Sequence, residues 1–565
     1  MFMDSATSGV EHQDYHSGGP VENSLFKSKY FIASVIATVI SIFYWSVFSL
    51  NAYNTYHEYS DLGLFAFDMY YHINFASAVH GLQYFVFANH IAIDQLLILP
   101  IFAVFTSALS LLIIQTLVVS ATGLVIFLVS RDIIKNEKIS LLLCLAFLIN
   151  PGTFGILIFD YHAEMMIPLL FILTFYFYFK KRIYPFVGSL LLLLGTMEIA
   201  PFIALAFAVT MAIYAIVREN DATTRRLWLK YSLIAIVVSV AVLIIYGYII
   251  NSLSNAYVAG QYPDLPSSLQ VLNTVSGQFA SVGAGLKLHP MPSGYMPMLA
   301  YVTFALLIVF VSFGLGGLFD PIFAVLFVSP WIFELFVIGN SAFIFPWYQY
   351  FGFSLGGSAV IAILSLKNID RKASENNFRF SFLEYGHKVG KYIIISIPIF
   401  MVALLLLWPY FVYSINVYNF QQAFLFYTNQ SARSQIQQLN SMIALLPENA
   451  SVMAPFFTMP HLFNRKYLEL IPSGPEGYNI LRLGSNSSTY MGDKYGFAQL
   501  MWFYPQYILS DFNPQISESA VSGYQVQNYQ NITDASIENG SAVFNGNYLI
   551  YNYSGLAILL KSKSS

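Results

Sequence analysis

Long apolar runs recur along most of this chain, and they limit its fold more than any other feature. Between Tyr30 and Phe411 each run is about long enough to cross roughly 30 Å of hydrocarbon. The composition agrees, since 57% of the residues are hydrophobic and only 10% are charged. The sequence therefore predicts a polytopic α-helical membrane protein with about eleven spans. We expect them at residues 30–51, 107–130, 139–158, 165–179, 184–199, 201–217, 231–250, 297–318, 321–339, 349–366 and 392–414.

Lysine and arginine alternate between the loops. Up to residue 414, one set of loops carries a single cation, Lys287. Basic residues near membrane spans are retained in the cytoplasm, so we expect the other set and the N-terminus to be cytoplasmic. An odd number of spans then places residues 415–565 outside. The basic set comprises Lys27, Lys29, Arg131, Lys135, Lys138, Lys180, Lys181, Arg182, Arg218, Arg225, Arg226, Lys230, Arg371, Lys372, Arg379, Lys388 and Lys391.

The acceptor sequence Asn-x-Ser/Thr occurs six times, and every copy lies beyond residue 428. Such sites are modified only on extracytoplasmic surfaces. Their confinement to one segment predicts an extracytoplasmic, glycosylated domain, in agreement with the charges. The asparagines are Asn429, Asn449, Asn486, Asn531, Asn539 and Asn552.

Three regions follow from these patterns. Residues 1–28 are polar and are expected to be a disordered cytoplasmic tail, followed by an anchor rather than a removable signal. Residues 29–414 form the transmembrane domain, with a long first outer loop at 52–106, in which 92–106 is expected to be an interfacial or re-entrant helix. Residues 415–565 are expected to form a soluble α/β domain. Its predicted elements are a helix at 421–443, strands at 450–454 and 507–511, and a closing strand pair at 548–551 and 556–560.

Cysteine use is minimal, because Cys144 is the one cysteine and lies within a predicted span. Intrachain disulfides and a cysteine metal site are therefore excluded. Together with the sequons and the expected anchor, this favours an archaeal surface membrane.

Ionisable residues gather on the predicted outer side. Such residues near hydrocarbon are costly and usually face a functional cavity, so an outer-face active or binding site is expected. The cytoplasmic loops contain no GxxxxGK[ST] phosphate-binding motif. The outer set comprises Glu58, Asp61, Asp68, His72, His80, His90 and Asp94, the turn Phe159-Asp160-Tyr161-His162-Ala163-Glu164, Glu198, Asp264, Lys287 and His289.

Several motifs follow one another in a specific order and spacing. They are Asp61–Phe65, then His90 with Pro100 and Gln115 downstream, Tyr161–Glu164, Leu446–Ala454, Pro460–Arg465 and Gln506–Asp511. These motifs resemble the predicted membrane family called "domain of unknown function 2079". Ala163, Ile199 and Gln349 depart from the residues usual at those places. The family layout is similar to GT-C-type glycosyltransferases. The resemblance therefore implies a GT-C-like core and a polyprenyl-phosphate-linked sugar as donor.

In such a transferase, a base removes the proton of the acceptor hydroxyl and the leaving phosphate is stabilised. Asp61 is the expected base, although it could instead cap a helix beginning at Leu62. Glu164 and Glu198 are further catalytic candidates. His90, His162 and Glu164 form a donor set suited to a divalent metal ion, or else a polar cluster that joins the spans.

The remaining candidates would bind substrate. Lys287, followed by His289, could neutralise the phosphate, and Arg465 and Lys466 are a second option, with ordinary surface placement as the alternative. His461 is a further substrate-binding candidate. Tyr348 and Tyr350 lie in the outer turn 345–350, where aromatic rings can contact a sugar or anchor the interface.

Two other functional classes stay open. Glu334 within a span favours a lipid or solute transporter or flippase. A non-catalytic scaffold could use the outer domain to bind a surface glycoprotein or another cell-envelope partner. Membrane lipids are expected contacts in every case, and no nucleic acid is expected.

Overall fold

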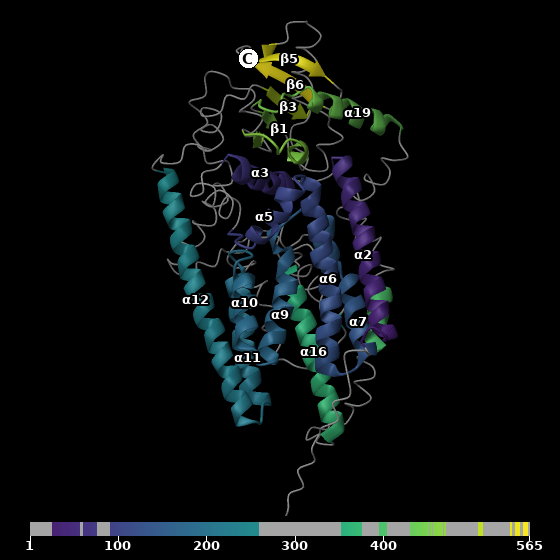
Figure 1. Ribbon diagram of the computed structural model, residues 1–565, viewed down its shortest axis with the longest axis vertical. Coiled ribbons are helices and arrows are strands. Elements are labelled where there is room, and N and C mark those ends of the chain that lie inside the picture. Colours follow the sequence, from purple (N-terminus) through teal and green to yellow (C-terminus); the bar gives the residue numbers. More distant parts are fainter. Residues whose placement is uncertain are drawn as a thin grey trace, which may run out of the picture.

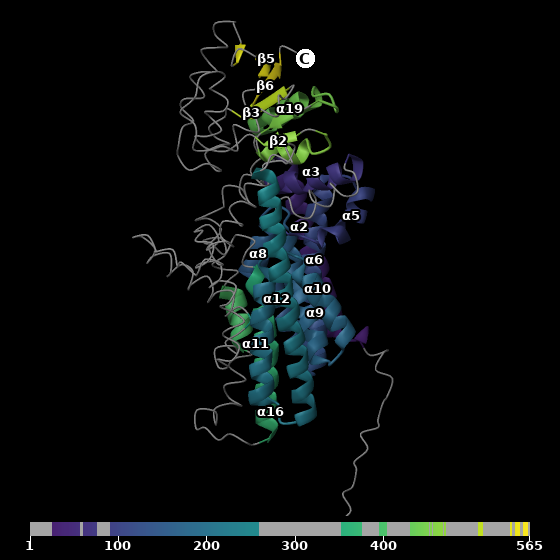
Figure 2. The ribbon, with the colours of Figure 1, turned by 90° about the vertical axis from the view of Figure 1, so that its left-hand side faces the viewer.

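The apolar runs fold into long helices that lie side by side, with a small sheet beyond one end of the bundle (Figure 1). The computed structural model describes residues 25–56, 60–75, 91–258, 313, 352–375, 395–403, 430–450, 452–454, 456–466, 468–470, 507–511, 543–544, 548–553 and 557–562. Consecutive helices pack against each other: α6 against α7, α9 against α10, and α11 against α12 (Figure 2). Helices that are not consecutive also pack together, as α2 does against α6 and α16 against α9. The bundle consists of α2 (Lys29–Asn54), α6 (Ala108–Ile134), α7 (Glu137–Leu148), α8 (Pro151–Ile158), η1 (Ala163–Met166), α9 (Ile167–Phe179), α10 (Ile183–Leu194), α11 (Ala200–Arg218), α12 (Ala222–Val258) and α16 (Gly352–Glu375).

Four helices among the described residues are long and apolar enough to cross a membrane: α2, α6, α11 and the Ala222–Tyr248 part of α12. The pair α7–α8 is bent by 43° and would make a fifth if it forms one span. The chain is thus a helical membrane protein with several apolar helices. The predicted span 321–339 lies outside the described residues, as does 297–318 except for residue 313, and only 395–403 of the last span is described. The total of eleven therefore stays a prediction.

Two predicted spans differ from the helices that form. The run 139–158 is interrupted because Asn150 caps a new helix through Gly152 N–H at 2.9 Å, and Pro151 occupies its first position. The run 184–199 ends early, since α10 stops at Leu194. Glu198 consequently lies in the connection to α11 rather than at the end of a span.

The predicted short helix in the first outer loop is present as α5 (Gln95–Val104). Gln95, Ile98 and Phe102 are buried, while Leu97 and Val104 are exposed. A helix with an exposed apolar face suits an interfacial or re-entrant position in the bilayer.

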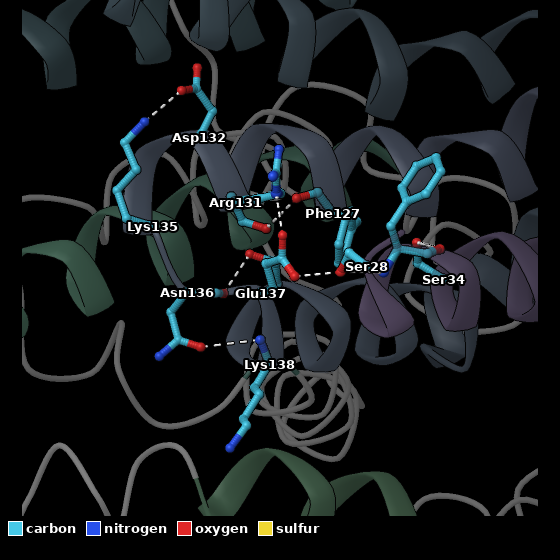
Figure 3. Close-up of polar contacts among 12 residues, drawn as sticks. Ser28, Ser34, Phe127, Arg131, Asp132, Lys135, Asn136, Glu137 and Lys138 are labelled. Atoms are coloured by element: carbon cyan, nitrogen blue, oxygen red, sulfur yellow. Dashed lines mark hydrogen bonds and ion pairs between the residues drawn. The ribbon is translucent and has the colours of Figure 1, made fainter. Parts of the chain in front are cut away.

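Basic loops gather at one end of the bundle. At the α6–α7 connection, Arg131 Nε lies 2.7 Å from Glu137 Oε1, and the Ser28 hydroxyl before α2 donates to the same carboxylate (Figure 3). Asp132 pairs with Lys135 at 2.8 Å and with Lys180, at the end of α9, at 2.6 Å. Three of the segments with predicted cytoplasmic charges therefore meet at one place: the residues before α2, the α6–α7 connection and the end of α9.

The described C-terminal strands form one six-stranded sheet in the order β2-β1-β3-β6-β5-β4. Strand β1 runs parallel to β2 and β3, and the other neighbouring pairs are antiparallel. The predicted closing pair is present as β5 and β6, with a register shift between Ile550 and Asn552. The strands are β1 (Val452–Ala454), β2 (Leu468–Leu470), β3 (Tyr507–Asp511), β4 (Val543–Phe544), β5 (Tyr548–Tyr553) and β6 (Ala557–Ser562), preceded by helix α19 (Gln430–Ala444).

A short 3-10 helix joins this part of the chain to the bundle. Helix η8 (Phe456–His461) packs against α3 (Ser60–Asn74), which follows α2 in the first outer loop. The His461 ring lies 4.2 Å from the Tyr53 ring and 4.1 Å from the Tyr56 ring, between centroids. The Tyr53 hydroxyl donates to the Pro460 carbonyl at 3.3 Å. The residues after the sheet's first strand thus contact the same loop that contains Asp61.

Candidate functional site

One side chain of α6, Gln115, fixes the turn between α8 and η1 through hydrogen bonds to its backbone. Gln115 Nε2 donates to the carbonyls of Ile156, Phe159 and Asp160, at 2.9, 3.3 and 3.2 Å. Gln115 Oε1 accepts the His162 N–H at 3.1 Å. These bonds satisfy buried backbone groups that no helix satisfies, and they hold His162 in an extended conformation with φ −141° and ψ 149°.

Three ionisable side chains converge at this turn. His162 Nε2 lies 2.8 Å from Asp61 Oδ2, and His162 Nδ1 lies 3.2 Å from Asp160 Oδ1. Asp160 Oδ2 also accepts the Leu62 N–H at 2.9 Å. Asp160 and His162 are buried, whereas the Asp61 side chain is 31% exposed. Asp61 is therefore the member of the cluster that a substrate can reach.

The cap on the first turn of α3 comes from a distant residue. Leu62 N–H is satisfied by Asp160, not by Asp61, although Asp61 stands in the first turn of the helix. A carboxylate near a helix N-terminus is stabilised by the helix dipole. The Asp61 carboxylate interacts with the imidazole of His162.

Burial and neighbouring charges oppose each other at both buried members, and the pKa of each is raised. Burial raises the pKa of Asp160 to about 6, although its hydrogen bond and charge interaction with His162 oppose the rise. Burial alone would lower the pKa of His162, but Glu164, Asp61 and Asp160 outweigh it and raise that pKa well above the usual value. In the absence of a bound ion, the imidazole is thus held in its charged form by the surrounding carboxylates.

The same three residues fit a divalent cation. One ligand atom from each of Asp61, Asp160 and His162 can be chosen so that all lie within 4.8 Å of one another. Two carboxylates and an imidazole suit Mn²⁺, Zn²⁺ or Fe²⁺ as well as harder ions. Metal binding would require the imidazole to release its proton.

Glu164, two residues further along the chain, is fully buried in η1, and its charge acts on His162. Glu198 lies apart from the cluster on the loop before α11, where its Oε2 accepts the Ile91 N–H at 3.3 Å. The structure therefore brings Asp61 and His162 together, with Asp160 rather than Glu164 as the third member of the cluster. It places Glu198 next to the segment that leads into α5. His90, Lys287, His289, Tyr348 and Tyr350 lie outside the described residues.

The two C-terminal candidates make contacts within the fold. His461 Nε2 donates to the Tyr53 carbonyl at 3.1 Å. The Arg465 guanidinium donates to the carbonyls of Pro447, Ala450 and Leu446, the last at 3.4 Å. Of the predicted glycosylation sites, Asn449 is exposed next to this turn, and Asn552 lies in β5. The other four asparagines fall outside the described residues.

Three residues of the site had no role assigned to them from the sequence. Asp160 and Asp94 were expected only as members of the outer ionisable set. Asp160 precedes His162 by two, and alternate residues of an extended segment share one side, so this spacing is the signal that pairs them. Asp94, at the start of α5, is buried, and the charge of Glu164 acts on it. Gln115 entered only through the family resemblance, and its contacts are to backbone groups outside its own helix.

The "Predicted membrane protein (DUF2079)" family model matches residues 34–488. This range covers the helical bundle, the Asp61–His162 cluster and the contact between η8 and α3. The chain belongs to the DUF2079 family. A comparison with curated proteins gave no match. The DUF2079 assignment therefore establishes an integral membrane protein of a family of unknown function, and the activity has to be argued from the site.

Proposed function

We propose that this protein is a GT-C-like glycosyltransferase that uses a polyprenyl-phosphate-linked sugar at the extracytoplasmic face. The observation that supports this most directly is the 2.8 Å contact between the partly exposed Asp61 and the buried His162, with Asp160 behind it. A carboxylate held by a buried imidazole at the end of a helical bundle is suited to accept a proton from a hydroxyl.

The placement of the site supports the orientation. Gln115 contacts the site and Arg131 lies among the basic loops, and the two are about 24 Å apart along α6 at 1.5 Å per residue. Basic loops mark the cytoplasmic side. The Asp61 cluster then lies near the outer boundary of the hydrocarbon, where a lipid-linked donor presents its phosphate and sugar.

The proposed reaction is a displacement at the anomeric carbon. The acceptor oxygen forms a bond to that carbon, the bond from the carbon to the phosphate oxygen breaks, and the polyprenyl phosphate leaves with the electron pair. The acceptor proton passes to the Asp61 carboxylate. His162 and Asp160 keep Asp61 oriented, and Glu164 and Glu198 are further proposed catalytic acids.

A divalent cation bound by Asp61, Asp160 and His162 would supply positive charge to the leaving phosphate. The other phosphate and sugar contacts are proposed for Lys287, His289, Tyr348 and Tyr350. His461 and Arg465 stay candidates that could contribute from the segment packed on α3, where their described contacts hold that segment in place.

We further propose that residues 415–565 form an extracytoplasmic α/β domain that carries the glycosylation sites. Its support is the mixed sheet at the end of the molecule nearest α3 (Figure 1), together with the confinement of all six sequons to this part of the sequence. Acceptor proteins of the cell surface would reach the site from this side.

The test is transfer by the purified full-length protein in lipid vesicles that contain polyprenyl-phosphate-linked sugars with a labelled sugar. We expect the wild type to release polyprenyl phosphate, and Asp61→Asn to lower the rate by about 10²–10⁴-fold. Asp221→Asn is the matched control, because Asp221 is an exposed acid in the α11–α12 loop and asparagine also caps a helix well.

Two outcomes would contradict the proposal. One is equal rates for Asp61→Asn and wild type. The other is movement of the intact labelled lipid across the vesicle membrane with no loss of its sugar, which would favour a flippase.

A further inference from the structure

A second pair of acids lies beyond the Asp61–Asp160–His162 cluster. Asp94 stands at the N-terminus of α5 and is 2% exposed, and Glu164 lies in η1 and is 0% exposed. Helix α5 is joined to the turn that precedes η1 by a hydrogen bond of 2.8 Å from the Tyr161 hydroxyl to Gln95 Oε1. Two acids far apart in sequence are therefore held in one buried region.

The carboxylates of this pair are poorly satisfied among the described residues. All four oxygens of Asp94 and Glu164 are buried, and none has a hydrogen-bond partner of good geometry there. The backbone N–H groups of Asp94 and Gln95 lie near enough to the Asp94 carboxylate to lower its pKa, but burial outweighs them. Asp94 does not cap α5 with its side chain. Among the described residues, neither Asp94 nor Glu164 forms an ion pair with lysine or arginine. Such groups are rarely left unsatisfied in folded proteins, and each exception requires an explanation.

The two acids also act on each other. Burial, and then the negative charge of Glu164, raise the pKa of Asp94 well above its usual value. Both acids likewise raise the pKa of Tyr161, after burial. The charge of Glu164 also acts on His162, so the imidazole is the one counter-charge near the pair among the described residues. Two buried carboxylates with at most one such counter-charge are still unfavourable, and a cation between them would reduce that cost.

We propose that Asp94 and Glu164 form a second cation site, separate from the Asp61 cluster, that binds a hard divalent cation such as Mg²⁺, Mn²⁺ or Ca²⁺. Carboxylate oxygens alone select such ions, whereas the imidazole of His162 makes the first site suitable for softer ones. The bound ion would also fix α5 against η1, because its ligands come from both elements. Cation binding by Asp94 and Glu164 does not depend on the proposed transfer reaction.

The test is Mn²⁺ stoichiometry of the full-length protein in detergent, by equilibrium dialysis and electron paramagnetic resonance. We expect two Mn²⁺ per chain for the wild type and one for Asp94→Asn. The remaining ion should be lost on replacing His162 as well, in Asp94→Asn/His162→Asn. Asp94 is the chosen position because Glu164 also acts on His162.

Asp68→Asn is the matched control, since Asp68 is a buried acid of α3 whose pKa is raised by burial alone. It should retain two ions. Thermal unfolding with and without Mg²⁺ gives a second measurement. Wild type and Asp68→Asn should gain more stability from Mg²⁺ than Asp94→Asn does.

Equal stoichiometry in wild type and Asp94→Asn would overturn the proposal. An infrared band of a protonated carboxyl group in the Mg²⁺-loaded wild type, absent from Asp94→Asn, would also overturn it, because the pair would then hold a proton instead of a cation. Neither readout depends on sugar transfer, so failure here and failure of the proposed activity are distinguishable.

Discussion

Gly63 and Met459 lie in direct contact although they are almost 400 residues apart. A Cβ added to Gly63 would lie 2.5 Å from Met459 Cβ and 2.9 Å from both Met459 C and Pro460 N. Because two of these atoms belong to the backbone, a rotamer change cannot relieve the overlap. The first turn of α3, which contains Asp61, is thus packed against η8 as closely as a backbone allows.

Gly63→Ala is expected to push η8 away from α3 and to destabilise the protein by about 1–3 kcal/mol, the usual cost of overpacking. The thermal midpoint in detergent should fall, and proteolysis within residues 456–466 should become faster. The rate of sugar transfer should fall together with the thermal midpoint if η8 positions the turn that contains Asp61.

Gly188→Ala is the control for this substitution. Gly188 lies in α10 and a Cβ there meets nothing within 4 Å. Alanine is favoured over glycine in helices by about 1 kcal/mol, so this variant should be at least as stable as the wild type. A loss of stability of the same size in both variants would show that the Gly63 contact has no special role.

The protein is expected to lose stability in mild acid because His461 is buried in its neutral form. Burial beside Tyr53 and Tyr56 lowers its pKa to about 4, against about 6.5 for an unfolded histidine. The contribution of the neutral ring is therefore fully present above pH 6.5 and is lost as the pH falls from about 6.5 to about 4. Proteolysis of the η8 segment should accelerate over that window, and His461→Gln should flatten the dependence. An unchanged profile in His461→Gln would assign the effect to other groups.

Gln115→Ala should weaken cation binding at the proposed Asp61–Asp160–His162 site without removing one of its three ligands. The side chain donates to three carbonyls of the turn and accepts the His162 N–H. Loss of such outer contacts typically lowers metal affinity by about 10–100-fold. Mn²⁺ titration checks this, with Gln437→Ala on exposed α19 as the control. Identical affinities in the two variants would refute the role assigned to Gln115.

Topology can be tested with cysteine labelling, because the native Cys144 is fully buried in α7. Asn449→Cys should react with a membrane-impermeant maleimide in intact cells. Lys135→Cys, at a side chain 73% exposed among the basic loops, should react only after permeabilisation. The opposite pattern would invert the proposed orientation and place the Asp61 cluster on the cytoplasmic side.

Local patterns predicted a large part of the fold. Apolar length predicted membrane helices, and the interruption by Asp94 and Pro100 predicted the short helix that forms as α5. Turn residues were less well anticipated: Asn150 and Pro151 divide one predicted span into α7 and α8, because a capped helix start competes with continuation of the helix.

At the site, the sequence by itself determined the membrane setting, the loop that contains Asp61 and the turn that contains His162 and Glu164. Only the tertiary structure decided that Asp160 caps α3 from 98 residues away, that Gln115 holds the turn, and that Asp94 and Glu164 face a common buried region. The reason is physical. Hydropathy and caps act over a few residues, whereas each of these contacts needs the bundle to pack first, so that groups from distant helices come within hydrogen-bond distance.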